Sequence, residues 1–260
     1  MQCTRRLYAQ AGFWSRSMNE FKRLSRIAVN METLEVPKKP YHLIKFDNPE
    51  KVDELKLMAD FQQGGFSKAD ITHHEETATE PSHIRFKGSI STELPPSRQD
   101  IQRSGYAAFR TKDFGRTIFG QWFWDVDPYA FLAMKIKSDG RRYHINIQTD
   151  SLVPTDIHQH RLYTTTPGEW ETVVVRFSDF VRTNYGMPVE PQSEMMKNKL
   201  KSVGIGLIDR VPGPFDISIA EIYATNYRSG QDAAEARKAL PEQQREQKEK
   251  KQEEPEKILM

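Results

Sequence analysis

The feature that most constrains this chain is an alternation of apolar and polar residues with a period of two. It recurs between residues 41 and 228, most clearly at 132–137, 143–148, 203–207 and 215–220. A strand that packs on a core with one face and meets solvent with the other produces this alternation. The sequence therefore predicts a domain built largely from half-buried antiparallel strands.

Three more segments favour strands, namely 83–90, 106–111 and 173–177, the last of which follows a Pro-Gly turn signal. In all, roughly eight to ten strands with few helices between them predict an all-β fold, a jelly-roll β-sandwich spanning 41–228. The longest connections are expected to be surface loops, which often carry function. These connections are 91–104, 112–128 and 182–199.

The N-terminal segment differs in charge from the rest of the chain. Residues 1–40 hold eight Lys or Arg and three Glu, and the first 19 residues hold no acid. Apolar side chains recur along one side of a helix, at Phe13, Phe21, Leu24 and Ala28. An acid-poor, Arg-bearing amphipathic start is typical of a mitochondrial presequence, so residues 1–30 are expected to direct import into the matrix and to be removed. The alternative is a retained basic helix that contacts a membrane or a partner.

The remaining flanks show no strand pattern. Residues 31–40 are expected to form a linker, because Pro37 and Pro40 oppose both helix and strand. The tail, 229–260, lacks aromatic residues and is rich in Gln, Glu and Lys, so we expect it to be charged and partly helical or disordered. No run approaches the roughly 20 apolar residues that span a bilayer, which predicts a soluble or peripheral protein.

Composition also excludes several functions. Residues 41–228 carry 23 basic and 25 acidic groups, which is not the basic footprint of a nucleic-acid binder. The single cysteine, Cys3, lies in the predicted presequence, so disulfides, cysteine-ligated zinc and a cysteine nucleophile are not expected. Nucleotide-binding loops, the nucleophile elbow of hydrolases and the helical zinc motif are missing from the sequence. We therefore predict no enzyme activity, no cofactor and no resident metal.

Two sets of polar residues could instead supply a metal site or a catalytic pair. His158 and His160 would share one face of a strand, and His144 could join them from a neighbouring strand, which is enough to hold a metal. The alternative, a solvated polar face, is favoured. Several aspartates could supply a hydrolase pair, but aspartate is common in turns. These are Asp125, Asp127, Asp139 and Asp150.

Binding sites are more plausible than catalytic ones. Trp122, Phe123 and Trp124 form an aromatic run inside a predicted loop. Exposed, these rings would make a platform for a protein or a sugar. Folded back, they would close one end of the sandwich.

Two further candidates for partner binding come from strand and turn positions. His144, Asn146 and Gln148 form the polar face of one predicted strand. Gly64 and Gly65 allow a close approach of the backbone to a ligand, or only a turn into the next strand.

An ordered set of short motifs resembles the complex I intermediate-associated protein family over about residues 41–225. The motifs are FQQGGFS at 61–67, FKG at 86–88, SGYA at 104–107, KSDGRRY at 137–143, GEW at 168–170, FSDF at 177–180, IGLID at 205–209 and GPFDI at 213–217. The resemblance implies a galactose-binding-like jelly roll. It also implies a mitochondrial chaperone that binds membrane-arm subunits or intermediates of complex I, with other assembly factors, in the matrix or peripherally on the inner membrane. A carbohydrate-binding module on the same kind of sandwich is the alternative.

Overall fold

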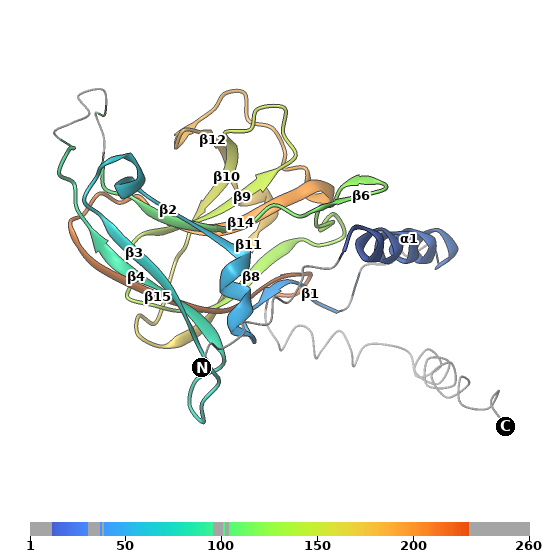
Figure 1. Ribbon diagram of the computed structural model, residues 1–260, viewed down its shortest axis with the longest axis horizontal. Coiled ribbons are helices and arrows are strands. Elements are labelled where there is room, and N and C mark those ends of the chain that lie inside the picture. Colours follow the sequence, from blue (N-terminus) through green and yellow to red (C-terminus); the bar gives the residue numbers. More distant parts are fainter. Residues whose placement is uncertain (1–11, 31–36, 38, 96–100, 102–103, 229–260) are drawn as a thin grey trace, which may run out of the picture.

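The structure, a computed structural model, describes residues 12–30, 37, 39–95, 101 and 104–228. Two antiparallel sheets lie one above the other in Figure 1 and enclose the core. The expected tail, most of the expected linker and the first 11 residues of the expected presequence lie outside the described residues.

Sheet A is the lower layer in Figure 1 and has the order β11-β8-β15-β4-β3, with β1 paired to β15 beside β4. Its longest strand, β15, pairs with β8 on one side and with β4 and β1 on the other. The strands are β1 (Tyr41–Lys45), β3 (Lys68–His74), β4 (His83–Ile90), β8 (Phe131–Ser138), β11 (Trp170–Arg176) and β15 (Gly213–Thr225).

Sheet B is the upper layer and has the order β13-β12-β10-β9-β14-β5-β2. Its centre, β9 against β14, keeps a continuous antiparallel register from Ser202 to Leu207. The strands are β2 (Leu55–Ala59), β5 (Ala107–Thr111), β9 (Tyr143–Thr149), β10 (Asp156–Arg161), β12 (Val181–Asn184), β13 (Met187–Pro188) and β14 (Leu200–Leu207).

The core lies between the sheets and is built from the alternation seen in the sequence. In β9 the even-numbered polar positions face outward, while Tyr143, Ile145 and Ile147 are fully buried. Phe86 contacts Phe109 across the core at 5.2 Å between ring centroids and Phe215 at 4.9 Å. Burying rings of this size between two sheets is the main source of stability in such a sandwich.

Short helical turns and one longer helix accompany the sheets. The 3₁₀ turns are η2 (Pro49–Glu54), η3 (Asp60–Gln63), η4 (Phe177–Asp179) and η5 (Lys197–Lys199). The helix α1 (Phe13–Asn30) packs beside a small hairpin made of β6 (Arg116–Thr117) and β7 (Gly120–Gln121). No helix in the described part of the chain is long and apolar enough to cross a membrane.

The predicted strands are present, and the sheets contain more. All seven segments favoured by the sequence form strands, and β4 begins and ends at the predicted residues. The expected surface loop 112–128 contains the β6–β7 hairpin, and 182–199 contains β13 and part of β12. The all-β sandwich expected from the alternation is confirmed.

Candidate functional site

The aromatic run 122–124 lies where the loop after β7 meets the start of β14. Trp124 is 5% exposed, and its backbone pairs with Leu200. Phe114 meets both tryptophans edge to face, at 4.2 Å from Trp122 and 4.5 Å from Trp124. Trp124 is therefore part of the core and offers no surface to a partner, whereas Trp122 and Phe123 stay partly exposed.

Trp122 also forms a hydrogen bond with helix α1. Its indole Nε1 donates a hydrogen bond of 3.0 Å to the Glu20 carboxylate. Glu20 is 9% exposed and is the only acid of the helix. The ring thus connects the sandwich to the N-terminal helix and is not a free platform.

The second candidate, the polar face of β9, lies on the outer face of sheet B. Gln159 of β10 donates from Nε2 to Asn146 Oδ1 at 2.9 Å, and Thr183 of β12 donates to Gln159 Oε1 at 3.0 Å. The side-chain amides of Asn146, Gln148 and Gln159, together with the Thr183 hydroxyl, form a surface that we call the amide row. Gly206 lies opposite His144, and a Cβ there would come within 2.8 Å of Asn146 Nδ2. The glycine therefore leaves room for the Asn146 side chain to lie across the sheet.

The amide row is a preorganised hydrogen-bonding surface. Asn146 is held by Gln159 of β10, and Gln148 Nε2 donates at 2.8 Å to the carbonyl of Pro154, in the turn between β9 and β10. Fixed donors and acceptors lose little freedom when a partner binds, which favours recognition of another polar surface. Proton transfer is not suggested, since amides and hydroxyls do not titrate near neutral pH.

The three histidines do not converge on one site, and the solvated polar face favoured from the sequence is wrong for His158 and His160, which face the core. His160 pairs with Ile145 and His158 pairs with Ile147, which places both imidazoles on the core side of sheet B. His144 pairs with Arg161 and faces outward. Within the described ranges, no group of three or more His, Cys, Asp or Glu side chains could hold a metal ion.

The surroundings of His158 and His144 disfavour the charged form of each imidazole. Burial lowers the pKa of His158 below its ordinary value, and the nearby Arg182 lowers it further. Burial, followed by Arg161, likewise lowers the pKa of His144. Neutral imidazoles suit a packed sheet and give no acid–base pair.

Gly64 and Gly65 close a turn around a buried carboxylate that sequence reasoning did not single out. Asp60 is 3% exposed and accepts four hydrogen bonds. The donors are the Ser67 amide (2.9 Å) and the Ser67 hydroxyl, Ser104 hydroxyl and Gly105 amide (2.8 Å each). A Cβ on Gly65 would lie 2.6 Å from Asp60 Cγ. The glycine is needed for this packing, and the motifs at 61–67 and 104–107 meet at one carboxylate.

A second polar clamp joins the motifs at 137–143, 205–209 and 213–217. Arg141 donates to both carboxylate oxygens of Asp209, at 2.8 Å from Nη2 to Oδ1, and to the carbonyls of Gly213 and Pro214. Asp139 accepts from the Asp216 amide at 2.8 Å. The clamp fixes the end of β14 against the start of β15. The sequence held a signal for this clamp, because its motifs contain an Arg and several Asp residues, and Arg commonly makes bidentate contacts with a carboxylate.

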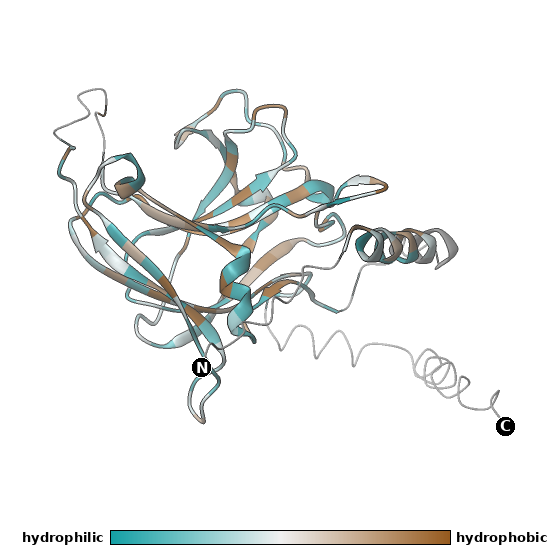
Figure 2. Cartoon of the chain, in the orientation of Figure 1, coloured by the Kyte–Doolittle hydropathy of each residue, from teal (hydrophilic) through white to brown (hydrophobic). Residues whose placement is uncertain are grey.

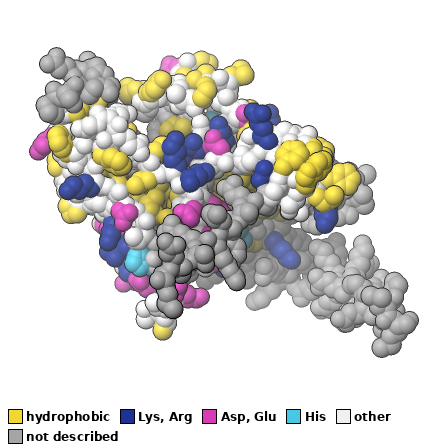
Figure 3. Space-filling model, in the orientation of Figure 1, with side chains coloured by type: hydrophobic (Ala, Val, Ile, Leu, Met, Phe, Trp, Pro, Cys, Tyr) yellow, Lys and Arg dark blue, Asp and Glu magenta, His cyan; other side chains and the backbone are white. Residues whose placement is uncertain are grey.

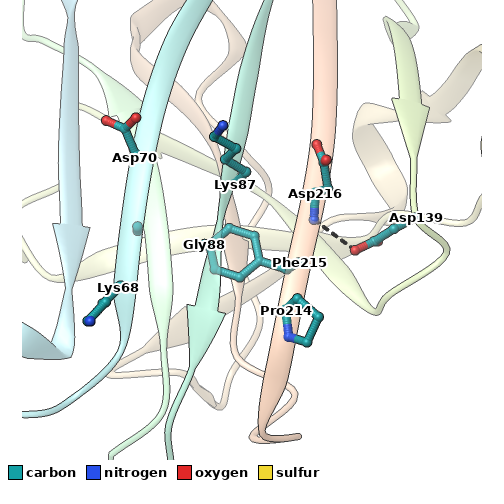
Figure 4. Close-up of a pocket in the computed structure, with 9 residues that line it drawn as sticks. Lys68, Asp70, Lys87, Gly88, Asp139, Pro214, Phe215 and Asp216 are labelled. Carbon is teal, nitrogen blue, oxygen red and sulfur yellow. Dashed lines mark hydrogen bonds between the residues drawn. The ribbon is translucent and has the colours of Figure 1, made fainter.

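The hollow in Figure 4 lies on the outside of sheet A, beside this clamp. It has a volume of about 540 Å³ and is bordered by Lys68, Asp70 and Lys87, with Asp139 and Asp216 at one side. The Phe215 ring lies over Gly88, its cross-strand partner. Asp216 also forms an ion pair with Arg85. The two aspartates are thus occupied in holding strands together.

The arrangement of the two sheets defines the fold class of the protein. A family 11 carbohydrate-binding module of a cellulosomal cellulase from Clostridium thermocellum matches 73% of this chain and 95% of its own length. The TM-score is 0.51 at 13% sequence identity, so the likeness concerns the fold alone. The chain has the fold of a jelly-roll β-sandwich, as the alternation in the sequence predicted.

Sequence relatives are more specific. Residues 44–219 match the family described as Complex I intermediate-associated protein 30. "Complex I intermediate-associated protein 30, mitochondrial" of Neurospora crassa is 43% identical over 232 residues, covering 82% of this chain and 84% of that protein. The mouse protein of the same name is 25% identical over 178 residues, covering 67% of this chain and 53% of that protein. The chain therefore belongs to the complex I intermediate-associated protein 30 family. It spans most of the Neurospora relative and about half of the mouse one.

Proposed function

We propose that this chain assists the assembly of mitochondrial respiratory complex I as a non-catalytic binding module. It holds membrane-arm intermediates, together with other assembly factors, on the matrix side of the inner membrane. The observation that carries the proposal is its membership of the complex I intermediate-associated protein 30 family, through a match that covers most of the sandwich, from residue 44 to residue 219.

The amide row is the surface that best suits such a partner. Asn146 and Gln148 lie beside His144 on the outer face of β9, and hydrogen bonds to Gln159 of β10 and to Pro154 of the following turn fix the two amides. An assembly factor must bind and later release its client. A polar surface serves this well, because such interfaces are held by hydrogen bonds that water can replace.

A sugar ligand is not favoured by the same surface. The outward strand positions of β9, β10 and β14 carry polar residues, glycines and one isoleucine, and none of the Phe, Tyr or Trp rings on which a sugar commonly stacks. The likeness to a carbohydrate-binding module rests on the fold, and a fold does not fix a function.

The test is affinity capture of the tagged full chain from mitochondria that lack the untagged protein. We expect membrane-arm subunits of complex I to be captured and complex I to accumulate on native gels. A well-expressed tagged chain that captures none of these subunits, in cells whose complex I assembles normally, would refute the proposal.

A matched pair of variants tests the surface separately. Asn146→Ala with Gln148→Ala removes two amides spaced two residues apart on sheet B. Lys87→Ala with Ser89→Ala makes the same change on exposed positions of β4 in sheet A. We expect the first pair to lower capture about tenfold, equal to roughly 1.4 kcal/mol of binding, and the second to leave it unchanged. Equal capture by both pairs would exclude the amide row and leave the assembly role standing.

A further inference from the structure

Helix α1 packs against the sandwich with its polar side. Ser17 is 2% exposed, and its Oγ accepts a 3.0 Å hydrogen bond from the Ile118 amide. Glu20 faces inward to Trp122, and the Arg16 guanidinium donates to the Arg116 carbonyl. A surface helix of a globular protein ordinarily buries its apolar side. In α1 the most exposed apolar side chains, Trp14, Met18 and Phe21, instead lie on a different side from the buried Ser17 and Glu20.

The apolar side of α1 is consequently exposed. Trp14, Met18 and Phe21 recur at helical spacings of four and three, and the Trp14 side chain is 77% exposed. Figure 3 shows these hydrophobic side chains gathered over α1 with Lys and Arg beside them. Single exposed apolar residues are ordinary, but a contiguous group of this kind marks an interaction surface.

The tip of the β6–β7 hairpin extends the same surface. Ile118 and Phe119 are both at least half exposed. The Ile118 amide is bonded to Ser17, so the tip lies against the helix. Figure 2 shows the tip as a hydrophobic end on an otherwise mixed hairpin. We call the outer side of α1 and this tip the apolar end. Its residues are Trp14, Met18, Phe21, Ile118 and Phe119.

The charge of the apolar end selects its occupant. The sequence of α1 contains Arg16, Lys22, Arg23 and Arg26, and its single acid, Glu20, is buried against the sandwich. The hairpin adds Arg116 and no acid. Aromatic and apolar side chains bordered by Lys and Arg are the composition of helices that lie in the plane of an anionic lipid surface.

We propose that the apolar end docks this protein on an anionic lipid membrane, with α1 lying in the headgroup region and the sandwich held above it. The proposal deepens the membrane-side location given under the proposed function. It assigns α1 to a retained membrane-contacting helix and not to a removed leader, since Ser17 and Glu20 make specific bonds to the folded domain.

The test is flotation of the purified full chain with phosphatidylcholine vesicles that contain or lack phosphatidylglycerol. Binding is expected to the anionic vesicles and to weaken as salt is raised, because salt screens charged headgroups. Trp14→Ala with Phe21→Ala should lower the bound fraction at least about tenfold, since two large apolar side chains no longer leave water. Leu152→Ala with Tyr185→Ala, two highly exposed residues away from α1, is the matched control and should bind like the unchanged chain. Circular dichroism should show all variants folded.

Three outcomes would overturn the proposal. The first is a full chain that floats with neither vesicle. The second is equal flotation of the Trp14 and Phe21 variant and its control. The third is a mature mitochondrial protein whose N-terminus, read by mass spectrometry, starts after residue 30. If that variant instead loses captured complex I subunits while no form of the chain binds vesicles, the apolar end is a protein-binding surface. The proposed assembly role survives each of these outcomes, because capture of complex I subunits is measured independently.

Discussion

Asp60 offers the sharpest test of how this sandwich is held together. Replacing it by Ala leaves two buried backbone donors, the amides of Ser67 and Gly105, without their acceptor. An unsatisfied buried donor costs about 1–3 kcal/mol, so the two together cost about 4 kcal/mol. The Ser67 hydroxyl keeps an alternative acceptor in the Ser91 carbonyl at 3.2 Å and adds little. The expected loss is a large part of a usual domain stability of about 5–15 kcal/mol.

The measurement is urea denaturation of the purified chain, supported by thermal unfolding. A loss of about 4 kcal/mol should lower the melting temperature by about 8–16 °C in a domain of this size. Asp60→Asn should cost about half as much. The Ser67 and Gly105 amides point at different carboxylate oxygens, and a carboxamide can accept from only one of them. Asp53→Ala, at an exposed position of η2, is the control. If Asp60→Ala unfolds within about 1 kcal/mol of that control, the four-bond account of this turn is wrong.

Two other predictions follow from burial. Trp124→Ala should cost about 3–5 kcal/mol of unfolding free energy, as for other buried aromatics. The control, Leu152→Ala at a fully exposed position, should change urea denaturation little. Similar urea midpoints for the two variants would show that Trp124 is not a core residue. Because burial lowers the pKa of His158 below its unfolded value of 6.5, its contribution to stability is complete above that pH and is lost as the pH falls through the folded pKa. His158→Gln should therefore flatten the decline in unfolding free energy below pH 6.5, and a pH series of urea midpoints with an unchanged slope would contradict this.

The sequence predicted the centre of each sheet better than the edges. Ile145 and Ile147 alternate cleanly with polar neighbours, so β9 could be recognised and oriented. Strand β10 could not be oriented in the same way, because His158 and His160 are polar yet face the core. Because they are two residues apart on a strand, His158 and His160 were expected to share one face of the sheet. Only the register between β9 and β10 shows that His144 lies on the opposite face.

Site residues were harder to predict because their roles depend on distant partners. Asp60 sits 44 positions before Ser104, and nothing local in the sequence indicates that they meet. The sequence left open whether the aromatic run 122–124 is an exposed platform or closes one end of the sandwich. In the structure Trp124 is in the core, and Trp122 is bonded to Glu20. The sequence indicated an amphipathic helix but chose a different stripe. Trp14 and Met18 join Phe21 on the exposed side, because Ser17 and Glu20 bond inward to the sandwich.

The position of β15 has a consequence for the order in which the chain becomes structured. Among the described residues, β15 is the last strand in sequence, a central strand of sheet A and the one strand with which β1 pairs, through contacts such as Tyr41 with Ala224. A chain that emerges from a ribosome N-terminus first cannot complete this layer until residues near 225 have emerged. Strand β4 can pair early with β3, but β1 must wait nearly the whole length of the domain for its partner. Completion of sheet A therefore depends on distant pairings, which makes folding slow compared with that of helical proteins of similar size.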